Sequence, residues 1–427
     1  MRNDYLDHKG RPQVAVTGRG VVTSLGVGKS DNWTKLTAGQ SGIKPIRRFD
    51  THGLKVTIAG TVDHFNTVPY SAFDLSATMA ETAAAEAIEE AGIGSRSSFP
   101  GPVIVATPPS ELEWPHLRRL NDAPADSEFS GYARLLATAR TGRYAELARH
   151  VRFAAIADRL KDRFSTRGEP LSICTACASG ATTIQLGLEA IRRGETEAAL
   201  CVGTDATVHP EGLIRFSLLS ALSSANEPPH KASKPFAKRR DGFVIAEGAG
   251  ALVLESLASA KARGAPILGI VRGCGEKADS FHRTRSNPDG AAIIGAIRKT
   301  LDDAGVDPEQ IDYVNAHGTS TPENDRMEYF SLKAVLGDHL ARTPVSSNKS
   351  MIGHTLIAAG SVEAVFSLLT IETGILPPTI NYDEPDPDLP LDVVANVSRS
   401  KSVATVLSNS FGFGGQNVCV IFSGEPA

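Results

Sequence analysis

Short apolar runs alternate along the chain with longer amphipathic segments. Several of the runs are apolar on both faces, which is typical of strands buried within a sheet. The runs predict strands at Val14–Thr17, Val103–Ala106, Ala198–Val202, Gly250–Glu255, Ile311–Asn315, Val403–Leu407 and Val418–Phe422. The longer segments predict helices at Ala77–Ala91, Ser179–Arg193, Ala291–Ala304 and Ser361–Thr373. Strands interleaved with helices indicate an α/β layered fold.

The order of these elements suggests an internal duplication. Ser172–Ile191 runs from a strand through a tight turn into a helix of small residues, and Val345–Ile371 does the same. We therefore expect two similar α/β domains, over residues 1–262 and 263–427. The segment Pro108–Arg167 fits neither, since it is rich in arginine and mostly helical in pattern. It is predicted to be an excursion from the sheet.

Composition and charge describe an ordinary globular protein. The 427 residues carry 44 Lys and Arg against 48 Asp and Glu, a balance that leaves no electrostatic footprint for nucleic acid. Residues 1–12 are polar, so we expect no secretory signal. The uncharged stretches Pro170–Leu188 and Ser402–Gly424 are too rich in Ser, Thr, Asn and Gly for membrane spans. An odd count of 5 cysteines suggests reduced thiols and a cytoplasmic setting.

A nucleotide-binding loop is one interpretation of Gly18-Arg-Gly20, which follows the first predicted strand. The dinucleotide fingerprint requires a third small residue three positions on. Position 23 is Thr, and Gly26 and Gly28 interrupt any helix that could follow. The sequence therefore favours an ordinary strand-to-loop turn.

The spacing of Cys174-Thr-Ala-Cys177 admits several chemistries. As half of a zinc site it lacks a second pair, and as a redox motif it lacks flanking aromatic residues. Cys177 lies where a strand over Leu171–Cys174 turns into a helix from Ser179. The free N–H groups and the dipole at a helix N-terminus lower the pKa of a thiol and favour the reactive thiolate. Two interpretations of Cys177 therefore remain open: a nucleophile, or a buried cysteine that only fills a small gap.

Two histidines and a glycine-rich loop complete the candidate chemistry. His317 follows a predicted strand and His354 precedes a predicted helix, at the sheet edge where α/β folds place their sites. The other histidines lack this setting and are expected at the surface or in packing. The loop Ser410–Asn417 carries phenylalanines between glycines, which suits either a hairpin turn or a lid or pocket wall.

Cys177, His317, Lys349, His354 and the Gly-Phe-Gly-Gly loop, in this order, resemble the β-ketoacyl-acyl carrier protein synthase family. The elongating synthase II is the most similar type, and the resemblance covers nearly the whole chain. Its motifs are Val14–Gly26, Thr175–Gly180, Lys234–Gly250, Asn315–Asp325 and Ser347–His354. Together these motifs are highly specific.

The resemblance implies a thiolase-like fold, with two similar βαβ-containing halves in five layers, and a homodimer. It implies an acyltransferase that uses no metal or organic cofactor. The partner would be acyl carrier protein, which presents acyl and malonyl groups as thioesters. The product would be a 3-oxoacyl chain two carbons longer.

The resemblance also assigns roles within the site. The implied catalytic residues are Cys177, His317, Lys349 and His354. The thiolate would take the acyl group, and the histidines would assist decarboxylation of malonyl carrier. Lys349 would orient the site through a charge pair with Glu328.

The glycine-rich loop has an implied role of its own. Phe413 would gate the acyl pocket, and its backbone N–H, with that of Cys177, would form the oxyanion hole. The other implied members of the gate are Phe411, Gly412, Gly414 and Gly415.

The chain departs from the family between Thr107 and Pro115, where the family has a glycine-rich turn, and in the length of the excursion that follows. We expect this excursion to shape the acyl pocket and to favour long chains. In this respect the chain resembles synthases dedicated to special acyl groups, including the very long chains of lipid A in rhizobia and their relatives.

Rival functions share parts of this pattern. A type II polyketide ketosynthase has the same catalytic set. A non-catalytic chain-length subunit lacks the nucleophile that Cys177 supplies here. A thiolase needs a second catalytic cysteine near the C-terminus, and Cys419 lies inside a predicted strand, where a core position is expected.

Overall fold

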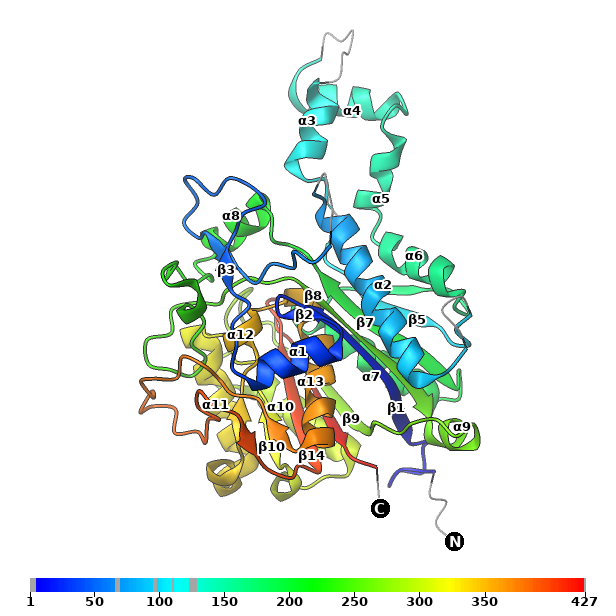
Figure 1. Ribbon diagram of the computed structural model, residues 1–427, viewed down its shortest axis with the longest axis vertical. Helices are drawn as coiled ribbons and strands as arrows, with labels where there is room; N and C mark the ends of the chain where they lie inside the picture. The colour runs from blue at the N-terminus through cyan, green and yellow to red at the C-terminus, as the bar shows by residue number, and fades with distance from the viewer. Residues whose placement is uncertain (1–4, 66–69, 95–97, 110, 123–128, 426–427) are drawn as a thin grey trace.

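One mixed sheet runs through the molecule (Figure 1). The computed structural model describes residues 5–65, 70–94, 98–109, 111–122 and 129–425. In this part of the chain the strand order is β11-β10-β14-β15-β9-β1-β8-β7-β5-β6, with β2 beside β1. The main strands are β1 (Val14–Thr23), β5 (Val103–Ala106), β6 (Leu171–Ile173), β7 (Ala198–Asp205), β8 (Gly248–Ser256), β9 (Gly269–Ala278), β10 (Tyr313–Asn315), β11 (Val345–Ser346), β14 (Thr405–Phe411) and β15 (Gln416–Ser423). The shorter strands are β2 (Gly26–Val27), β3 (Lys44–Pro45), β4 (Ile58–Ala59), β12 (Ile375–Leu376) and β13 (Arg399–Ser400).

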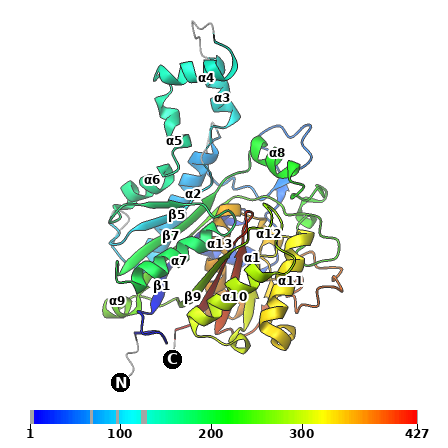
Figure 2. The ribbon, with the colours of Figure 1, turned by 180° about the vertical axis from the view of Figure 1, so that it is seen from behind.

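Helices cover this sheet and extend from it (Figures 1 and 2). Those of the first half are α1 (Lys29–Thr37), α2 (Ala72–Ala91), α3 (Trp114–Asp122), α4 (Gly131–Arg140), α5 (Ala148–Val151), α6 (Ala155–Phe164), α7 (Ser179–Arg192), α8 (Pro210–Leu218) and α9 (Leu257–Ala262). Those of the second half are α10 (Ala291–Ala304), α11 (Pro322–Leu336), α12 (Lys349–Ile352) and α13 (Ala359–Thr373).

The two halves of the chain build matching sets of strands. In the first half β1, β8 and β7 are antiparallel neighbours, and β5 and β6 continue from β7 in parallel. In the second half β9, β15 and β14 are antiparallel neighbours, and β10 and β11 continue in parallel. The pairing of β1 with β9 joins the sets into one sheet. The domain division at residues 262 and 263 stays a prediction, because the sheet is continuous.

Three hydrophobic cores separate the layers. Helices α7 and α13 share a central core that includes Ile184 and Val365. Helix α2 packs on the outer face of the first strand set, and α10 packs on the outer face of the second. Along β8, Leu252 and Leu254 face the central core while Val253 faces the outer one. Strands covered on both faces in this way are apolar on both faces, so the five-layered α/β arrangement is confirmed.

Helices α7 and α13 cross with their backbones in contact. A Cβ at Gly180 would lie 2.4 Å from the backbone N of Ser361, and a Cβ at Gly360 would lie 2.4 Å from the backbone N of Ala181. Only glycine permits such an approach. Since the crossing is at the N-terminal ends of both helices, it brings the turns that precede them close together.

The glycines of β1 serve the same kind of contact and bind no nucleotide phosphate. Gly18 and Gly20 lie inside the strand, and Cβ atoms there would come within 1.9 Å of carbonyl oxygens of Ala87 and Ala83 in α2. The strand continues to Thr23 instead of opening a loop. The interpretation of Gly18-Arg-Gly20 as a nucleotide-binding loop is therefore excluded, because these residues lie within a strand that packs on α2.

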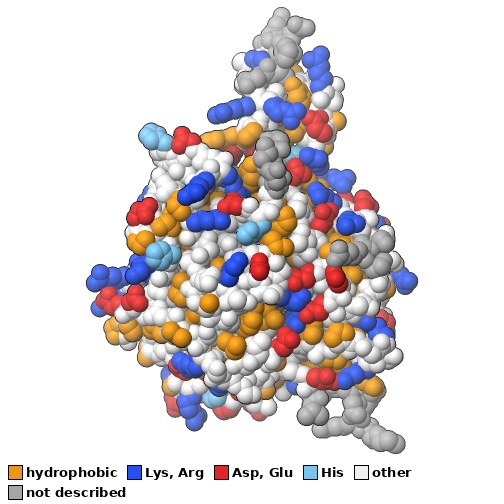
Figure 3. Space-filling view, viewed as in Figure 1, with side chains coloured by type: hydrophobic (Ala, Val, Ile, Leu, Met, Phe, Trp, Pro, Cys, Tyr) orange, Lys and Arg blue, Asp and Glu red, His pale blue; other side chains and the backbone are white. Residues whose placement is uncertain are grey.

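The excursion, residues 108–167, projects from the body of the molecule (Figure 1). Its described parts are mostly helical, as predicted, and consist of α3, α4, α5 and α6. Helix α6 returns to the body, where Leu160 and Phe164 join the outer core under α2. The projecting part carries both basic and hydrophobic side chains on the face seen in Figure 3.

One helical stretch, Leu356–Thr373, is long and apolar enough to cross a membrane by length and composition. It includes α13, and 83% of its window is buried within the protein. This is the ordinary setting of a core helix. The two uncharged stretches set aside from the sequence form β6 with α7 and the β14–β15 hairpin.

The helix crossing predicts a specific sensitivity to added volume. Gly180→Ala should lower the free energy of unfolding by about 2 kcal/mol, because the new methyl group forces α7 away from α13. Thermal denaturation measures this as a lower midpoint. The control is Gly424→Ala, whose Cβ would meet its nearest atom at an ordinary 3.6 Å. Equal midpoints for the two variants would contradict the proposed contact.

Candidate active site

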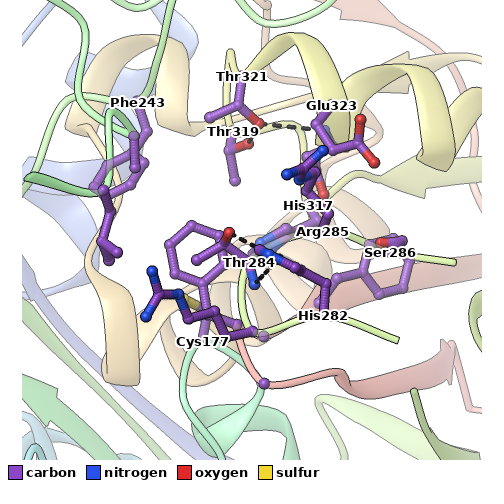
Figure 4. Close-up of a pocket in the computed structure, with 18 of the residues that line it drawn as sticks. Cys177, Phe243, His282, Thr284, Arg285, Ser286, His317, Thr319, Thr321 and Glu323 are labelled. Carbon is purple, nitrogen blue, oxygen red and sulfur yellow. Dashed lines mark hydrogen bonds between the residues drawn. The ribbon is translucent and has the colours of Figure 1, made fainter. Parts of the chain in front are cut away.

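The carboxyl ends of parallel strands bring the candidate residues to one edge of the sheet. Cys177 follows β6, His317 follows β10, and Lys349 follows β11. A cavity of about 730 Å³ opens there, and Cys177, His317 and His354 line it together with Phe411 and Phe413. Figure 4 shows Cys177 and His317 on the same cavity. The structure thus gathers residues from both halves of the chain around one space.

The nucleophile turn has an uncommon backbone. Ala176, directly before Cys177, has φ of 48°, a left-handed conformation that side chains rarely adopt. The turn is held by Ser179, whose hydroxyl accepts a 2.7 Å hydrogen bond from the N–H of Thr175. Cys177 is thereby fixed just before the first residue of α7, as the sequence predicts.

The glycine-rich loop lies directly against this turn. A Cβ at Gly412 would be 2.9 Å from the carbonyl oxygen of Thr175 and 3.2 Å from the backbone N of Cys177. The backbone N–H of Phe413 acts on the Cys177 sulfur, where it lowers the pKa of the thiol. The loop therefore forms a pocket wall, and it places the Phe413 amide next to the candidate nucleophile.

The Cys177 thiol is protonated at neutral pH in this setting. Burial raises the pKa of the thiol to about 12, while the Lys349 charge and the Phe413 N–H act in the opposite direction. The sequence predicts a lowered pKa from the helix N-terminus. Desolvation disfavours the charged thiolate more strongly than these groups favour it.

Lys349 is the buried cation of the site. Its side chain is 2% exposed and forms an ion pair with Glu363 of α13, itself 1% exposed. The ammonium also donates to Nδ1 of His317 at 3.4 Å. Burial raises the pKa of Glu363 to about 7, and the Lys349 charge opposes that rise.

The predicted charge pair between Lys349 and Glu328 is wrong. Glu328 instead accepts 2.8 Å hydrogen bonds from the backbone N–H groups of His317 and Gly318, and a 3.0 Å bond from the side chain of Asn409. These donors hold the Glu328 carboxylate in place. Burial raises its pKa, and the same hydrogen bonds oppose the rise. Glu328 therefore positions the backbone of the His317 turn.

His354 is fixed through both its backbone and its ring. Its N–H donates to the carbonyl of Val244 at 2.7 Å, and its carbonyl accepts from the N–H of Ala246 at 2.9 Å. The N–H of Leu356 donates to Nδ1 of the ring at 3.2 Å. Val244 and Ala246 belong to the long motif Lys234–Gly250. This motif therefore contributes to the site by holding the backbone of His354.

The two histidines present the same hydrogen-bonding group to the cavity. In each ring Nδ1 accepts a hydrogen bond, so the proton of the neutral imidazole lies on Nε2. Burial and the Lys349 charge lower the pKa of His317 and of His354 well below the usual value, which keeps both rings neutral. Their centroids are 5.3 Å apart and their planes nearly perpendicular. The arrangement offers paired N–H donors beside a thiol.

Some lining residues carry no sequence signal for a site. The segment 279–286 contributes Arg283 and Arg285 to the cavity. The carbonyl of Arg283 accepts from the N–H of Gly414 at 2.8 Å, which ties this segment to the glycine-rich loop. Phe216 and Phe243 form an apolar wall beside His354, with ring centroids 5.5 Å apart. A motif search cannot find such residues, because their spacing in the chain is arbitrary.

Two other expectations concern residues outside the cavity. Cys419 lies in β15 within the outer core under α10, so it is the core cysteine that the sequence predicts. None of the described residues of the excursion lines the cavity in a single chain. The expectation that the excursion shapes the acyl pocket is therefore not met within one chain.

Comparison with known proteins gives this site a family context. Residues 11–260 match the model of the beta-ketoacyl synthase N-terminal domain, and residues 268–383 match that of the C-terminal domain. The chain is 37% identical to the 3-oxoacyl-[acyl-carrier-protein] synthase 2 of Coxiella burnetii, over 96% of this chain and 98% of that protein. It is 35% identical to the tetracenomycin polyketide synthase ketoacyl synthase alpha subunit of Streptomyces glaucescens, over 94% and 95% of the two chains.

A solved structure extends the comparison to the fold. The ketosynthase in a solved complex with its type II polyketide acyl-carrier protein is similar to this chain. The two chains are 31% identical, with a TM-score of 0.84. The match covers 97% of this chain and all of that chain, 100%. The thiolase-like fold expected from the sequence is confirmed by such neighbours.

The high thiol pKa predicts how Cys177 reacts with iodoacetamide. Its alkylation rate should rise about tenfold per pH unit from pH 7 upward without a plateau, because only the thiolate reacts. A Cys174→Ser variant, with the Cys177 peptide followed by mass spectrometry, isolates the signal. A plateau below pH 8 would contradict the raised pKa.

A paired substitution tests the contribution of the buried cation. Lys349→Met together with Glu363→Gln removes both charges and avoids leaving one of them unpaired. The rate at which iodoacetamide alkylates Cys177 at a fixed pH should fall on the order of tenfold, because the Lys349 charge that stabilises the thiolate is gone.

Proposed function

The chain belongs to the beta-ketoacyl synthase family, and we propose that it is a 3-oxoacyl-acyl carrier protein synthase. It extends an acyl group held on Cys177 by two carbons, in a decarboxylative condensation with malonyl carrier. One observation carries the proposal. A thiol and two neutral imidazole Nε2–H groups converge on one cavity, and each Nδ1 accepts a hydrogen bond, from Lys349 at His317 and from the N–H of Leu356 at His354.

The first half-reaction transfers the acyl group. The Cys177 sulfur attacks the carbonyl of the acyl-carrier thioester, the bond to the carrier sulfur breaks, and the thiol proton leaves with the carrier thiol. Negative charge develops on the carbonyl oxygen during the attack. The backbone N–H groups of Phe413 and Cys177 would stabilise that oxygen. The N–H of Phe413 acts on the sulfur, and it belongs to the loop that packs against the Cys177 turn.

The second half-reaction forms the carbon–carbon bond. Malonyl carrier loses CO₂, and the electron pair of the broken bond moves onto the thioester as an enolate. Nε2–H of His317 and of His354 would donate to the enolate oxygen, and such donors are strongest in a dry, low-dielectric site. The enolate carbon attacks the acyl carbonyl on Cys177. The bond to sulfur then breaks, the 3-oxoacyl carrier leaves, and the thiolate regains a proton.

The loop around Phe413 would control the order of these steps. Phe411 is 7% exposed and packs on the ring of His317, with centroids 5.6 Å apart. Phe413 is half-buried against the wall that contains Phe216 and Phe243. Movement of Phe413 would open an apolar path for the acyl chain beside Cys177. The glycines at 412, 414 and 415 give the loop the freedom for that movement, with φ of 87° at the last two.

The carrier is expected to dock at the mouth of the cavity. Arg283, Arg285 and Arg326 lie among the residues that line it. These cations suit an anionic carrier and its phosphate-linked arm, although Arg326 also pairs with Glu323 at 3.2 Å. The solved ketosynthase complex shows a relative bound to an acyl-carrier protein.

A second candidate function is that of a type II polyketide ketosynthase. The similarity to the tetracenomycin subunit and to the ketosynthase bound to a hexaketide favours it. The two functions differ in product, because a polyketide enzyme repeats the condensation without reduction of the 3-oxo group. Mass spectrometry of carrier-bound products distinguishes one extension from several. The thiol at Cys177 argues against a chain-length subunit, and the core position of Cys419 argues against a thiolase.

We propose that two copies of the chain form a homodimer through the edge of the sheet. In the described part of the chain β6 pairs only with β5, so its other edge is open. Leu171 on this strand is 44% exposed, and Phe129 and Tyr132 of the excursion are 57% and 74% exposed. An open strand edge that carries an exposed apolar side chain is a common pairing surface.

The two half-reactions should separate by mutation. Cys177→Ala should abolish the acyl-enzyme and all condensation, because no other group accepts the acyl chain. His317→Ala and His354→Ala should still form the acyl-enzyme, while condensation falls by about 10²–10³-fold for each lost donor. Mass spectrometry of intact protein measures acylation, and release of labelled CO₂ measures decarboxylation.

The controls decide between a chemical and a structural effect. Each variant should melt within a few degrees of the wild type. Acylation retained in Cys177→Ala would refute the nucleophile. Loss of acylation in a folded His317 or His354 variant would refute the assignment of the histidines to the malonyl step.

The dimer has a direct test in sedimentation equilibrium. The wild type should sediment with about twice the 45.1 kDa mass of the chain. Leu171→Asp should shift the protein toward monomer, because it places a charge at the pairing edge. Val397→Asp is the matched control, since Val397 is 74% exposed and lies elsewhere. A monomeric wild type, or an equally dimeric Leu171 variant, contradicts the proposed edge.

A further inference from the structure

A cluster of potential metal ligands lies at the base of the excursion, away from the catalytic cavity. Glu113 directly precedes α3, His116 is in the first turn of α3, and His150 is in α5. One ligand atom from each of the three lies within 4.8 Å of the others. The imidazole rings of His116 and His150 have their centroids 4.2 Å apart. No motif in the sequence groups these histidines, because α3 and α5 are separate segments of the chain.

Unpartnered nitrogen atoms mark this cluster as incomplete. Nδ1 of His116 and Nδ1 of His150 are both buried and have no hydrogen-bond partner. His150 is only 3% exposed and Glu113 only 5%. A buried polar nitrogen without a partner is costly, and most such groups in folded proteins are satisfied.

We propose that Glu113, His116 and His150 bind a divalent transition-metal ion of the zinc type. Two imidazoles and one carboxylate are an established three-ligand set for Zn²⁺, with the fourth position left to water. Glu113 is already oriented, because one of its oxygens accepts a 2.9 Å hydrogen bond from the N–H of Ala72. Such a bond to a ligand carboxylate is typical of metal sites.

The ion would fasten the excursion to the body of the protein. Glu113 lies where the chain enters the projecting helices, and His150 lies where it returns. The ring of His150 also packs on Phe73 of α2, with centroids 5.1 Å apart. A metal shared by these residues joins α3, α5 and α2 at one point. None of the three residues lines the cavity in which the condensation is proposed to occur.

The charges around the cluster permit a cation. Carboxylates of Asp74, Glu111 and Glu211 lie near, and the opposing cations are Arg119 and Arg149. His209 is not a ligand candidate, since its Nδ1 contacts Glu211 at 3.0 Å. Arg149 Nε donates to Nε2 of His150 at 3.3 Å, a contact that competes with metal binding through Nδ1 because it fixes the other tautomer. The Arg149 side chain is 55% exposed and can turn into solvent.

This competition yields a test with effects in opposite directions. The full-length protein, freed of metal with EDTA, is titrated with Zn²⁺ and separately with Co²⁺. The wild type should bind one ion per chain, and Glu113→Gln and His150→Ala should each weaken binding at least about tenfold. Arg149→Gln should tighten it several-fold. His52→Ala, on an exposed surface loop, should leave the affinity unchanged.

Spectra and exchange rates identify the site independently of affinity. Bound Co²⁺ should show ligand-field bands without a sulfur charge-transfer band, which excludes Cys177 as the ligand. Zn²⁺ should slow hydrogen exchange in α3 and α5 of the wild type but not of Glu113→Gln. Failure of the wild type to bind, equal affinity in the ligand variants, or a sulfur band would overturn the proposal. Acyl-enzyme formation should survive in every variant, so the result is separate from that of the proposed function.

Discussion

The site depends on one buried charge, the ammonium of Lys349. It is paired with Glu363 in the central layer, and it reaches Nδ1 of His317. That contact sets the tautomer of His317, and the same charge lowers the pKa of both histidines and opposes the rise at Cys177. An isolated buried cation would be costly, so the ion pair with Glu363 is what allows Lys349 to remain there. A single charge therefore keeps the imidazoles neutral while it makes the thiol easier to ionise.

The fold explains how that charge comes to lie beside the thiol. The duplicated strand sets place equivalent turns after β6 and β11, and the crossing of α7 and α13 at Gly180 and Gly360 brings these turns together. Neither half could make the site alone, because the thiol comes from one and the histidines from the other. The segment around Val244 crosses from the first half and holds the backbone of His354. The glycines at the helix crossing and the ion pair of Lys349 with Glu363 thus hold the residues from the two halves of the chain together in one site.

The sequence predicts the strands and helices that have a strong pattern and misses those that do not. Val103–Ala106 and Ala291–Ala304 are predicted to the residue. β9 is missed, because its glycines and charged residues hide a strand that pairs with β15 along most of its length and with β1 over Gly269–Val271. α11 is missed because its polar residues reach a buried interior, where Glu328 and Asp325 bind backbone N–H groups. In both elements tertiary contacts outweigh local preference.

The site shows the same division between local and distant information. The turns of Cys177, His317 and His354 could be predicted, since each is a local motif, at the end of a strand for Cys177 and His317 and before a helix for His354. The partner of Lys349 could not, because the positions of Glu328 and Glu363 in the chain do not show which of them packs against the ammonium. The raised pKa of Cys177 was missed for a similar reason, since a sequence shows the helix N-terminus but not how strongly the fold desolvates the sulfur.

Neutron diffraction from crystals of the resting enzyme at neutral pH tests this account most directly, because it locates protons. The account predicts a proton on Nε2 and none on Nδ1 in both His317 and His354, three protons on Lys349 Nζ, and a protonated sulfur at Cys177. An imidazolium at either histidine, a proton on either Nδ1, or a neutral Lys349 amine would contradict it.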